Sequence, residues 1–417
     1  MGLYNIGMYL YQKAIGVASL RSTKARQWRD GRRCIFERLS QSIGDSDRIV
    51  WVHCASLGEF EQGRPIIERI REQRPDLKIL LTFFSPSGYE IRKNYTGADY
   101  IFYLPIDRKR YARRFLDIVK PEVAIFIKYE FWLNYLSELR RRKIATYVVS
   151  AIFRRDSIFF RPWGGAWRKA LTTFTTLFVQ NEESKALLGE LGMTNAVVAG
   201  DTRFDRVAAI AKAAKRVEIV ERFRGDSPLF VAGSTWGPDE EILIELINDN
   251  PSIRFVVAPH EMDQTRIKHI IDSVRGGAIR YTQTDEHTQF DATQVLILDT
   301  VGILSSVYGY ARWSYIGGGF GVGIHNTLEA ATFGLPIAFG PKYQKFKEAR
   351  DMVALGAAQS IRSAEELKAW FKPLRDDADH LAATSRKAKE YTERNLGATE
   401  LICNEVLKGV SRWELRG

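Results

Sequence analysis

Two acidic side chains stand where a strand-like segment gives way to a helical one. Glu59 closes the run Ser-Leu-Gly-Glu that follows the apolar segment 48–55, and Glu130 follows the apolar segment 123–128. A carboxylate at such a point can take a proton from an attacking hydroxyl. It can equally complement the positive end of the next helix, an effect of roughly 0.3–1 kcal/mol. Position alone leaves both roles open for both residues.

A third candidate region is rich in glycine. Residues 317–323 read Gly-Gly-Gly-Phe-Gly-Val-Gly and lead into Ile-His-Asn-Thr-Leu-Glu at 324–329. Glycine lets the backbone approach a phosphate closely, and the free N–H groups of a helix start favour an anion. Asn326 can cap the helix or touch a nucleotide, and Glu329 can accept hydrogen bonds from ribose hydroxyls. The run predicts a nucleotide-phosphate site, with a purely structural turn as the alternative.

Other turns of the same kind follow apolar segments at 233–236, 259–261 and 299–302. The second reads Pro-His-Glu, so that His260 can contact a phosphate or serve the structure alone. The turn after the first apolar segment holds only Gly58, whereas a dinucleotide-binding turn needs three glycines in a GxGxxG spacing. An ordinary NAD-binding domain is therefore disfavoured.

The elements that must position these residues alternate between short apolar runs and helical stretches, which predicts α/β domains with parallel sheets. Ligands then bind at the carboxyl ends of the strands, where all of these turns lie. The predicted strands are 48–55, 78–85, 100–104, 123–128, 146–151, 176–180, 196–199, 229–234, 254–259, 295–299, 313–317 and 336–339.

The strand series breaks near 200–226, which predicts two doubly wound, Rossmann-like domains. We expect a membrane-associated helical segment at 1–34, an acceptor-binding domain at 35–205, a linker at 206–225, a nucleotide-sugar domain at 226–370, and helices at 371–417 that pack back across both domains. A chain of 417 residues has enough length for two such cores.

The net charge of +11 predicts an anionic partner: nucleic acid, an acidic membrane surface, or a phosphorylated or carboxylated substrate. Three scattered cysteines give neither a disulfide framework nor a zinc site. Residues 1–20 are mostly apolar and 21–33 are basic, with no run long enough to span a bilayer. The pattern predicts a segment lying among anionic headgroups, or else a buried helix followed by a solvated basic turn.

Five ordered motifs resemble those of the Kdo transferases, which transfer 3-deoxy-D-manno-octulosonic acid (Kdo) from CMP-Kdo to lipid A precursors. They are Ser56-Leu57-Gly58-Glu59, Leu104-Pro105-Ile106-Asp107, Glu130-Phe131-Trp132-Leu133-Asn134, Gly200-Asp201-Thr202-Arg203-Phe204-Asp205 and His325-Asn326-Thr327-Leu328-Glu329. The likeness extends from the N-terminal helix to at least residue 350. Where the family commonly has Pro-Arg-His, this chain has Pro259-His260-Glu261, and Arg203 stands for a usual lysine.

The resemblance implies a GT-B fold of two Rossmann-like domains with an interdomain cleft, and metal-independent, inverting transfer without a cofactor beyond the donor CMP-Kdo. It makes Glu59 the general base, with Glu130 and Arg203 stabilising the transition state. The CMP contacts it implies are Pro259, His260, Gly302, Ile303, Leu304, Asn326, Thr327, Leu328 and Glu329.

The implied partners are CMP-Kdo, the lipid A precursor (lipid IVA) and anionic lipid of the cell inner membrane, on whose cytoplasmic side the protein would lie. Two rival functions remain at this stage. One is a GT-B lipid glycosyltransferase with a UDP-sugar donor, and the other is an inert membrane-bound protein that keeps the fold. The sequence carries no nucleic-acid-binding motif, so no nucleic acid polymer is expected as a partner.

Overall fold

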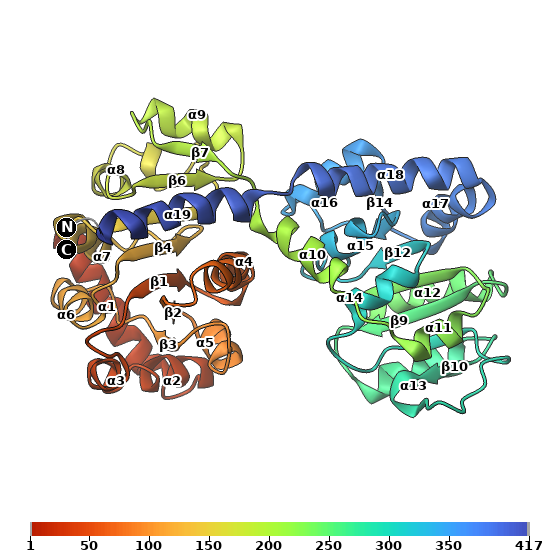
Figure 1. The fold of residues 1–417 in the computed structure, drawn as a ribbon. Coiled ribbons are helices and arrows are strands. Elements are labelled where there is room, and N and C mark those ends of the chain that lie inside the picture. The colour runs from red at the N-terminus through yellow and green to blue at the C-terminus, as the bar shows by residue number, and fades with distance from the viewer. Residues whose placement is uncertain (1, 415–417) are drawn as a thin grey trace. The chain divides into compact units, whose positions relative to one another are not determined.

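The computed structural model describes residues 2–414, with the backbone alone for 411–414. The chain divides into two compact units (Figure 1): unit 1 holds residues 2–205 and 396–414, and unit 2 holds residues 206–395. Each unit contains one seven-stranded sheet in which every pair of neighbouring strands runs parallel.

The sheet of unit 1 has the strand order β3-β2-β1-β4-β5-β6-β7. The chain begins at the centre with β1, builds outward through β2 and β3, and then returns to the other side of β1 with β4. The strands are β1 Ile49–Cys54, β2 Lys78–Phe83, β3 Tyr100–Tyr103, β4 Val123–Ile127, β5 Ala145–Ala151, β6 Thr176–Val179 and β7 Ala196–Val198.

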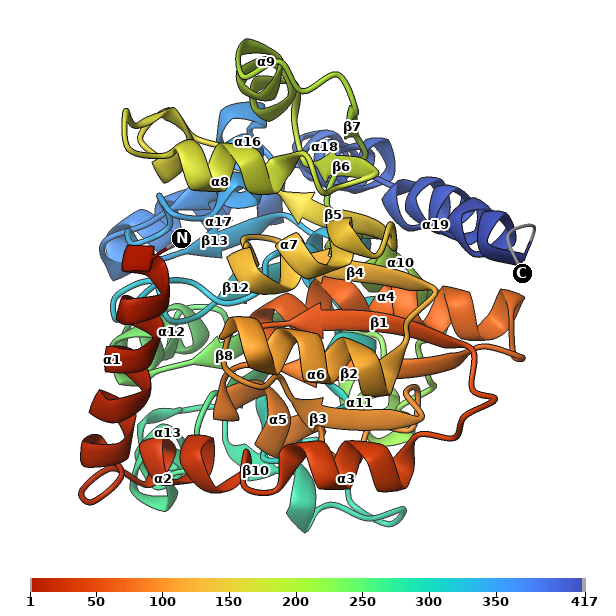
Figure 2. The same cartoon turned by 90° about the vertical axis from the view of Figure 1, so that its left-hand side faces the viewer.

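Helices cover both faces of this sheet, and three of them precede it. The helices are α1 Gly2–Ala18, α2 Thr23–Asp30, α3 Ile35–Ser42, α4 Leu57–Gln73, α5 Pro86–Arg92, α6 Lys109–Val119, α7 Leu133–Arg141, α8 Gly165–Leu171, α9 Glu182–Glu190 and α19 Ala398–Glu414, with a 3-10 turn at Ile158–Phe160. α10 Thr202–Lys212 starts in unit 1 and lies mostly in unit 2. Figure 2 shows α2 and α3 running along the β3 edge of the sheet, with α1 rising from the start of α2.

The sequence of β1, Ile-Val-Trp-Val-His-Cys, explains why helices pack on both faces of the sheet. All six residues are buried, and such continuous apolar runs are typical of parallel strands sandwiched between helices. Trp51 points into the core cluster that includes helices α3, α6 and α7, whereas Val52 belongs to the opposite cluster with α4 and α19. In that second cluster Cys403 of α19 lies against the backbone of Ile66 in α4.

A buried carboxylate ties α1 to the sheet. Asp107 follows β3 and is fully buried, and its Oδ2 accepts a 2.5 Å hydrogen bond from the Tyr4 hydroxyl. The same carboxylate accepts from the backbone N–H groups of Asn134 and Tyr135 at 3.1 Å each, which satisfies the start of α7. Burial raises the pKa of Asp107 to about 6.

The sheet of unit 2 repeats the plan with the order β10-β11-β9-β8-β12-β13-β14. Its strands are β8 Leu229–Thr235, β9 Arg254–Pro259, β10 Ala278–Arg280, β11 Val295–Ile297, β12 Trp313–Ile316, β13 Ile337–Phe339 and β14 Ala358–Ser360. Its helices are α11 Glu218–Arg224, α12 Gly237–Asn248, α13 Gln264–Ser273, α14 Leu304–Val307, α15 Leu328–Thr332, α16 Lys347–Leu355, α17 Ala364–Asp376 and α18 Ala378–Arg394, with 3-10 turns at Tyr281–Gln283 and Tyr308–Tyr310.

All twelve strands predicted from the sequence are confirmed, each within two residues at either end. Two short strands, β10 and β14, were not predicted. Both lie at sheet edges and hold only three residues each, too few to show a periodic apolar pattern. Residues 206–225, expected as a linker, hold most of α10 and all of α11, and the helical tail begins with α17.

No helix among the described residues has the length and apolarity that crossing a bilayer requires.

Gly317 gives a direct test of how tightly β8 and β12 pack. A Cβ at this position would lie 2.2 Å from the Ser234 carbonyl oxygen and 2.6 Å from Thr235 Cα, and neither backbone atom can swing away. We expect Gly317→Ala to lower the free energy of unfolding by about 2–3 kcal/mol, as overpacking does. Gly321→Ala, four residues on, is the matched control because its Cβ would meet nothing nearer than 3.5 Å. Equal melting temperatures for the two variants in calorimetry would contradict this packing.

Candidate active site

The two carboxylates predicted from the sequence of unit 1 lie at one edge of its sheet. β1 and β4 are parallel neighbours, so their carboxyl ends meet where the strand order reverses. Glu59 lies in the first turn of α4, after β1, and Glu130 lies between β4 and α7. Burial, and then the negative charges of Glu59 and Glu130, raise the pKa of the Cys54 thiol at the end of β1.

Glu59 is partly exposed and held from its own turn. The Ser56 hydroxyl donates a short hydrogen bond to Glu59 Oε2, and Ser56 is also the residue that begins α4. Gly58 beside them is exposed, and a Cβ there would meet nothing nearer than Ser56 Oγ at 3.8 Å. The carboxylate is thus oriented by one neighbour and still open to an incoming hydroxyl group.

Glu130 is fixed by two ring nitrogens. Its Oε2 accepts from Trp132 Nε1 at 2.7 Å and lies 3.3 Å from His53 Nε2. The residue after β4 is Lys128 with φ of 64°, a left-handed conformation that turns the chain out of the sheet just before Glu130. Side-chain contacts and backbone turn together place this carboxylate at the edge.

His53 extends the contact of Glu130 into the core. It is fully buried in β1, and its Nδ1 lies 3.1 Å from the carbonyl oxygen and 2.9 Å from the hydroxyl of Thr82 in β2. Trp132 Nε1 lies 3.1 Å from His53 Nε2 as well as 2.7 Å from Glu130 Oε2, so the three side chains form one polar cluster. The buried imidazole therefore couples the orientation of Glu130 to the interior of the sheet.

Arg203 is oriented by an aspartate two residues before it. Its Nε donates to Asp201 Oδ2 at 2.9 Å, and its backbone N–H donates to Asp201 Oδ1 at 3.0 Å. Asp201 Oδ1 also accepts from Gln62 Nε2 at 3.2 Å, one turn after Glu59 in α4. The hydrogen bonds thus link Arg203 to α4, the helix that also carries Glu59.

In unit 2 a buried aspartate organises the corresponding edge, where β8 and β12 end. Asp239 in the first turn of α12 accepts from the Trp236 N–H at 2.9 Å, the Tyr315 hydroxyl at 2.7 Å and the Gly318 N–H at 2.9 Å. These donors come from the end of β8, from β12 and from the glycine-rich turn. Burial raises the pKa of Asp239.

Three aromatic rings stack at the start of α12: those of Trp236, His260 and His325. The rings of Trp236 and His260 lie 4.9 Å apart between centroids, and those of His260 and His325 lie 4.3 Å apart. Trp236 Nε1 donates to His325 Nε2 at 3.1 Å, so His325 is neutral and carries its proton on Nδ1. Burial, and then the neighbouring His260, lower the pKa of His325 to about 4.

The helix after the glycine-rich turn is short. α15 begins at Leu328, after irregular residues, and has five residues. Asn326 Oδ1 accepts from the Leu328 N–H at 3.1 Å, but the residue in the N-cap position of α15 is Thr327, and Asn326 Nδ2 donates to Glu329 Oε1 at 2.9 Å. The buried Thr327 hydroxyl has no hydrogen-bond partner among the described residues, which leaves a donor for a ligand.

The other predicted nucleotide contacts lie at strand ends of the same sheet. Pro259 ends β9 and is buried, and the exposed His260 that follows it donates its backbone N–H to the Thr235 carbonyl oxygen at 2.9 Å. Gly302, with φ of 92°, turns the chain before Ile303 and Leu304, which begin α14. β9 and β11, which precede these turns, are adjacent parallel strands, so the turns emerge at one edge of unit 2.

Sequence reasoning missed His53 and Asp239. A signal was present for both: His53 is the one polar residue in an otherwise apolar buried strand, and Asp239 stands three residues after Trp236, where a strand gives way to a helix. Among the residues that the structure describes, no group of three or more His, Cys, Asp or Glu side chains could hold a metal ion.

Comparisons with known proteins bear on these two edges. Residues 30–206 match the family model described as "3-Deoxy-D-manno-octulosonic-acid transferase (kdotransferase)". The 3-deoxy-D-manno-octulosonic acid transferase of Rickettsia bellii is 26% identical over 379 residues, which cover 88% of this chain and 89% of the relative. That of Bordetella pertussis is 27% identical over 368 residues, with 84% and 85% covered. Residues 30–206 thus match a Kdo transferase domain, and most of the chain is similar to Kdo transferases.

The protein is a glycosyltransferase with the GT-B fold. Among solved structures, the UDP-GlcNAc 2-epimerase from Neisseria meningitidis is similar with a TM-score of 0.60 and 15% sequence identity, covering 87% of this chain and all of that one. At this level of sequence identity the similarity shows the fold alone. The fold is evident in the two parallel sheets and their strand orders.

The neutral state of His325 has a measurable consequence. Because the folded pKa of about 4 lies below the usual value of 6.5, the unfolded chain binds more protons between these pH values. The contribution of His325 to stability is thus lost as the pH falls from 6.5 to 4, by an amount on the order of 2 kcal/mol once screening by solvent is allowed for. In an NMR titration of histidine Cε1 resonances, the resonance that disappears in His325→Asn should stay in its neutral position down to about pH 4. A midpoint near 6.5 for that resonance would contradict the burial and the Trp236 contact.

Proposed function

We propose that the protein transfers Kdo from CMP-Kdo to the lipid A precursor lipid IVA, in the biosynthesis of lipopolysaccharide. The observation that carries the proposal is the position of Glu59, oriented by Ser56 at the reversal of strand order within a matched Kdo transferase domain. The curated relatives bear the name of this activity.

Glu59 is the proposed general base. Its carboxylate takes the proton of the acceptor hydroxyl as that oxygen forms a bond to the anomeric carbon of Kdo, with inversion. The bond between that carbon and the phosphate oxygen breaks, and CMP leaves with the electron pair. The hydrogen bond from Ser56 orients the carboxylate, while exposed Gly58 beside it leaves room for the acceptor.

Glu130 and Arg203 are the proposed partners of the transition state. The Kdo carboxylate and the departing phosphate are negative, and a guanidinium group can hold either through paired N–H donors. Asp201 presents Arg203 in a fixed orientation, and the contacts of Glu130 with His53 and Trp132 hold that carboxylate in place to favour positive charge developing at the anomeric carbon. In this proposal the transfer needs no metal ion.

Unit 2 is the proposed site for CMP. The turns of Pro259 and His260, of Gly302 to Leu304, and of Asn326 to Glu329 all lie at the carboxyl ends of its strands, where open parallel sheets bind nucleotides. His260 is an exposed imidazole in stacking contact with His325, which suits contact with a phosphate or a base. The unpartnered Thr327 hydroxyl supplies a further donor among the described residues.

The proposed location is the cytoplasmic face of the inner membrane. α1 carries a stripe of exposed apolar side chains that water does not favour: Leu3, Ile6, Leu10, Val17 and, just after the helix, Leu20. The basic residues of α2 follow directly and suit anionic headgroups.

Replacing Glu59 tests the proposed base. Glu59→Gln keeps the size of the side chain and an oxygen for the Ser56 hydrogen bond but cannot accept the proton. We expect kcat for Kdo transfer to lipid IVA to fall by about 10²–10⁴-fold, with the KM for CMP-Kdo changed little.

Glu72→Gln is the matched control for this experiment, since Glu72 is an exposed glutamate near the other end of α4. Its transfer rate should equal that of the wild type. A Glu59→Gln enzyme that keeps the wild-type kcat would remove Glu59 from the role of base, and absence of transfer by the wild type would reject the proposed function itself.

Glu329→Gln tests the proposed ribose contact. A neutral amide accepts hydrogen bonds more weakly than a carboxylate, and charge-assisted bonds are worth about 1.5–3 kcal/mol, so the Kd for CMP should rise roughly tenfold or more. Isothermal titration calorimetry with CMP measures this directly. Glu365→Gln, an exposed change on α17 of the same unit, should bind CMP as the wild type does. Equal affinities for both variants would exclude Glu329 from the nucleotide site.

A further inference from the structure

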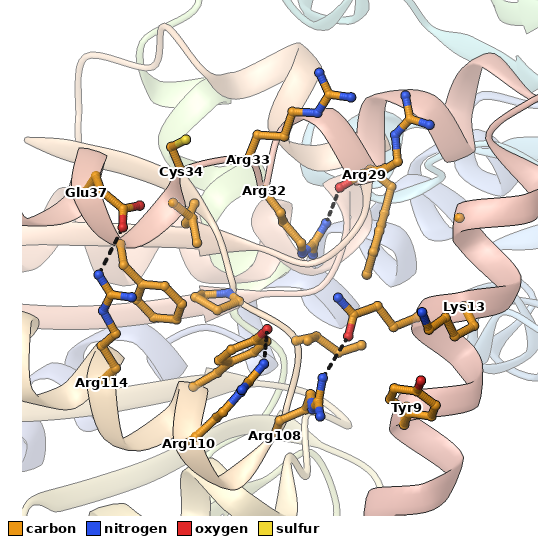
Figure 3. Close-up of a pocket in the computed structure, with 18 of the residues that line it drawn as sticks. Tyr9, Lys13, Arg29, Arg32, Arg33, Cys34, Glu37, Arg108, Arg110 and Arg114 are labelled. Atoms are coloured by element: carbon orange, nitrogen blue, oxygen red, sulfur yellow. Dashed lines mark hydrogen bonds and ion pairs between the residues drawn. The ribbon is translucent and has the colours of Figure 1, made fainter.

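A groove of about 990 Å³ lies in unit 1 away from the residues of the proposed catalytic site (Figure 3). Its walls come from α1, from α2 with the turn after it, from α3, from the segment after β3 and from α6. None of Glu59, Glu130 and Arg203 lines it. The groove therefore needs a separate explanation.

The charge of the groove is strongly one-sided. Seven basic side chains and one carboxylate, Glu37, line it. The basic residues are Lys13, Arg29, Arg32, Arg33, Arg108, Arg110 and Arg114. Figure 3 shows Lys13 on α1 and Arg108, Arg110 and Arg114 on the side of α6, whereas the guanidinium groups of Arg29 and Arg33, which pair with Asp30, point away from these. Arginines gathered from separate helices and loops suit a phosphate, which can accept several N–H donors at once.

Arg32 supplies a positive charge that no carboxylate balances. Its guanidinium donates to the carbonyl oxygens of Leu104, Trp28 and Phe84 at 2.8–2.9 Å and stacks 3.8 Å from the Trp28 ring. Among the described residues it forms no ion pair, and burial lowers its pKa to about 9, which keeps it charged near neutral pH. A partly buried, unbalanced cation in the wall of a groove attracts an anion more strongly than a solvated one.

An apolar surface adjoins these charges. The exposed side chains of α1 and the residues after it recur at the spacing of one helical face. Val17 and Leu20, exposed by 70% and 73%, belong to this face and also line the groove. A soluble phosphate ion would leave them in water, whereas acyl chains would cover them.

We infer that the groove is a binding site for the phosphate of an acidic phospholipid, whose acyl chains lie against the apolar face of α1. The inference rests on the membrane partner named in the proposed function and gives that partner a defined site. Arg108 and Arg110 hold the phosphate with Arg32 behind them, so that one lipid molecule is bound in the groove rather than attracted diffusely by the net charge.

Vesicle flotation of the full chain with a charge-matched pair of variants tests this site. The groove variant is Arg108→Glu with Arg110→Glu. The control is Lys24→Glu with Arg113→Glu, on α2 and α6, which are exposed but do not line the groove. Both variants lower the net charge by the same amount. Vesicles are phosphatidylcholine alone or phosphatidylcholine with phosphatidylglycerol, at physiological ionic strength.

We expect the groove variant to lose about tenfold or more in its partition to vesicles containing phosphatidylglycerol, and the control to lose much less. Equal losses would overturn the inference in favour of diffuse attraction. Competition by inorganic phosphate, with full release from vesicles, would also overturn it, because the site would then bind free phosphate. Circular dichroism confirms that both variants are folded.

Transfer to lipid IVA in detergent micelles separates this inference from the proposed function. The groove variant should keep wild-type transfer there, since its changes lie outside the catalytic residues. Normal vesicle binding together with a raised KM for lipid IVA would assign the groove to the acceptor and overturn the phospholipid assignment. Lack of transfer by every variant and by the wild type would count against the proposed function while leaving the vesicle comparison decisive.

Discussion

Parallel pairing at the centre of each sheet is the constraint on which the sites depend. In unit 1 the chain starts at β1 and later returns to β4 beside it, and in unit 2 it starts at β8 and returns to β12. Because the connections from the two central strands depart to opposite sides, the turns after these strands leave a crevice at their carboxyl ends. Glu59 and Glu130 follow one such pair of strands, and Trp236 and the glycine-rich turn follow the other.

Buried polar groups then hold these turns in place. An unpaired carboxylate or imidazole in such surroundings is costly, so each one fixes the donors that satisfy it. Asp239 joins the end of β8, β12 and the glycine-rich turn, and His53 joins Glu130 to Thr82 in the neighbouring strand. Asp107 does the same for α1 and α7. The positions of the turns at each sheet edge are thus fixed by the hydrogen bonds that satisfy buried polar groups within each unit.

Much of this architecture could be predicted from the sequence. Strands such as β1 and β9 are apolar runs bounded by charged or turn residues. This pattern is local in the sequence and does not depend on contacts with distant residues. The positions of Glu59 and Glu130 followed, since parallel strands bring their carboxyl ends together. The contact between His53 and Glu130 could not, because it joins residues far apart in the chain through a strand pairing that has no local pattern. The groove likewise depends on how α1, α2 and α6 pack around the β3 edge.

The start of α15 shows a second limit of prediction from the sequence. The glycine run and the residues after it read as a turn leading straight into a helix, but the chain stays irregular up to Thr327. Contacts with residues distant in sequence hold it there: Asp239 binds the Gly318 N–H, and Trp236 binds His325. Periodicity detects regular elements, whereas irregular segments held by distant side chains have no period to detect.

Donor choice is the most direct test of the central claim. The wild-type protein is incubated with lipid IVA and either CMP-Kdo or a set of UDP-sugars, and the lipid product is examined by mass spectrometry. The account predicts a lipid heavier by Kdo with CMP-Kdo alone. Sugar addition from a UDP-sugar, with none from CMP-Kdo, would contradict it.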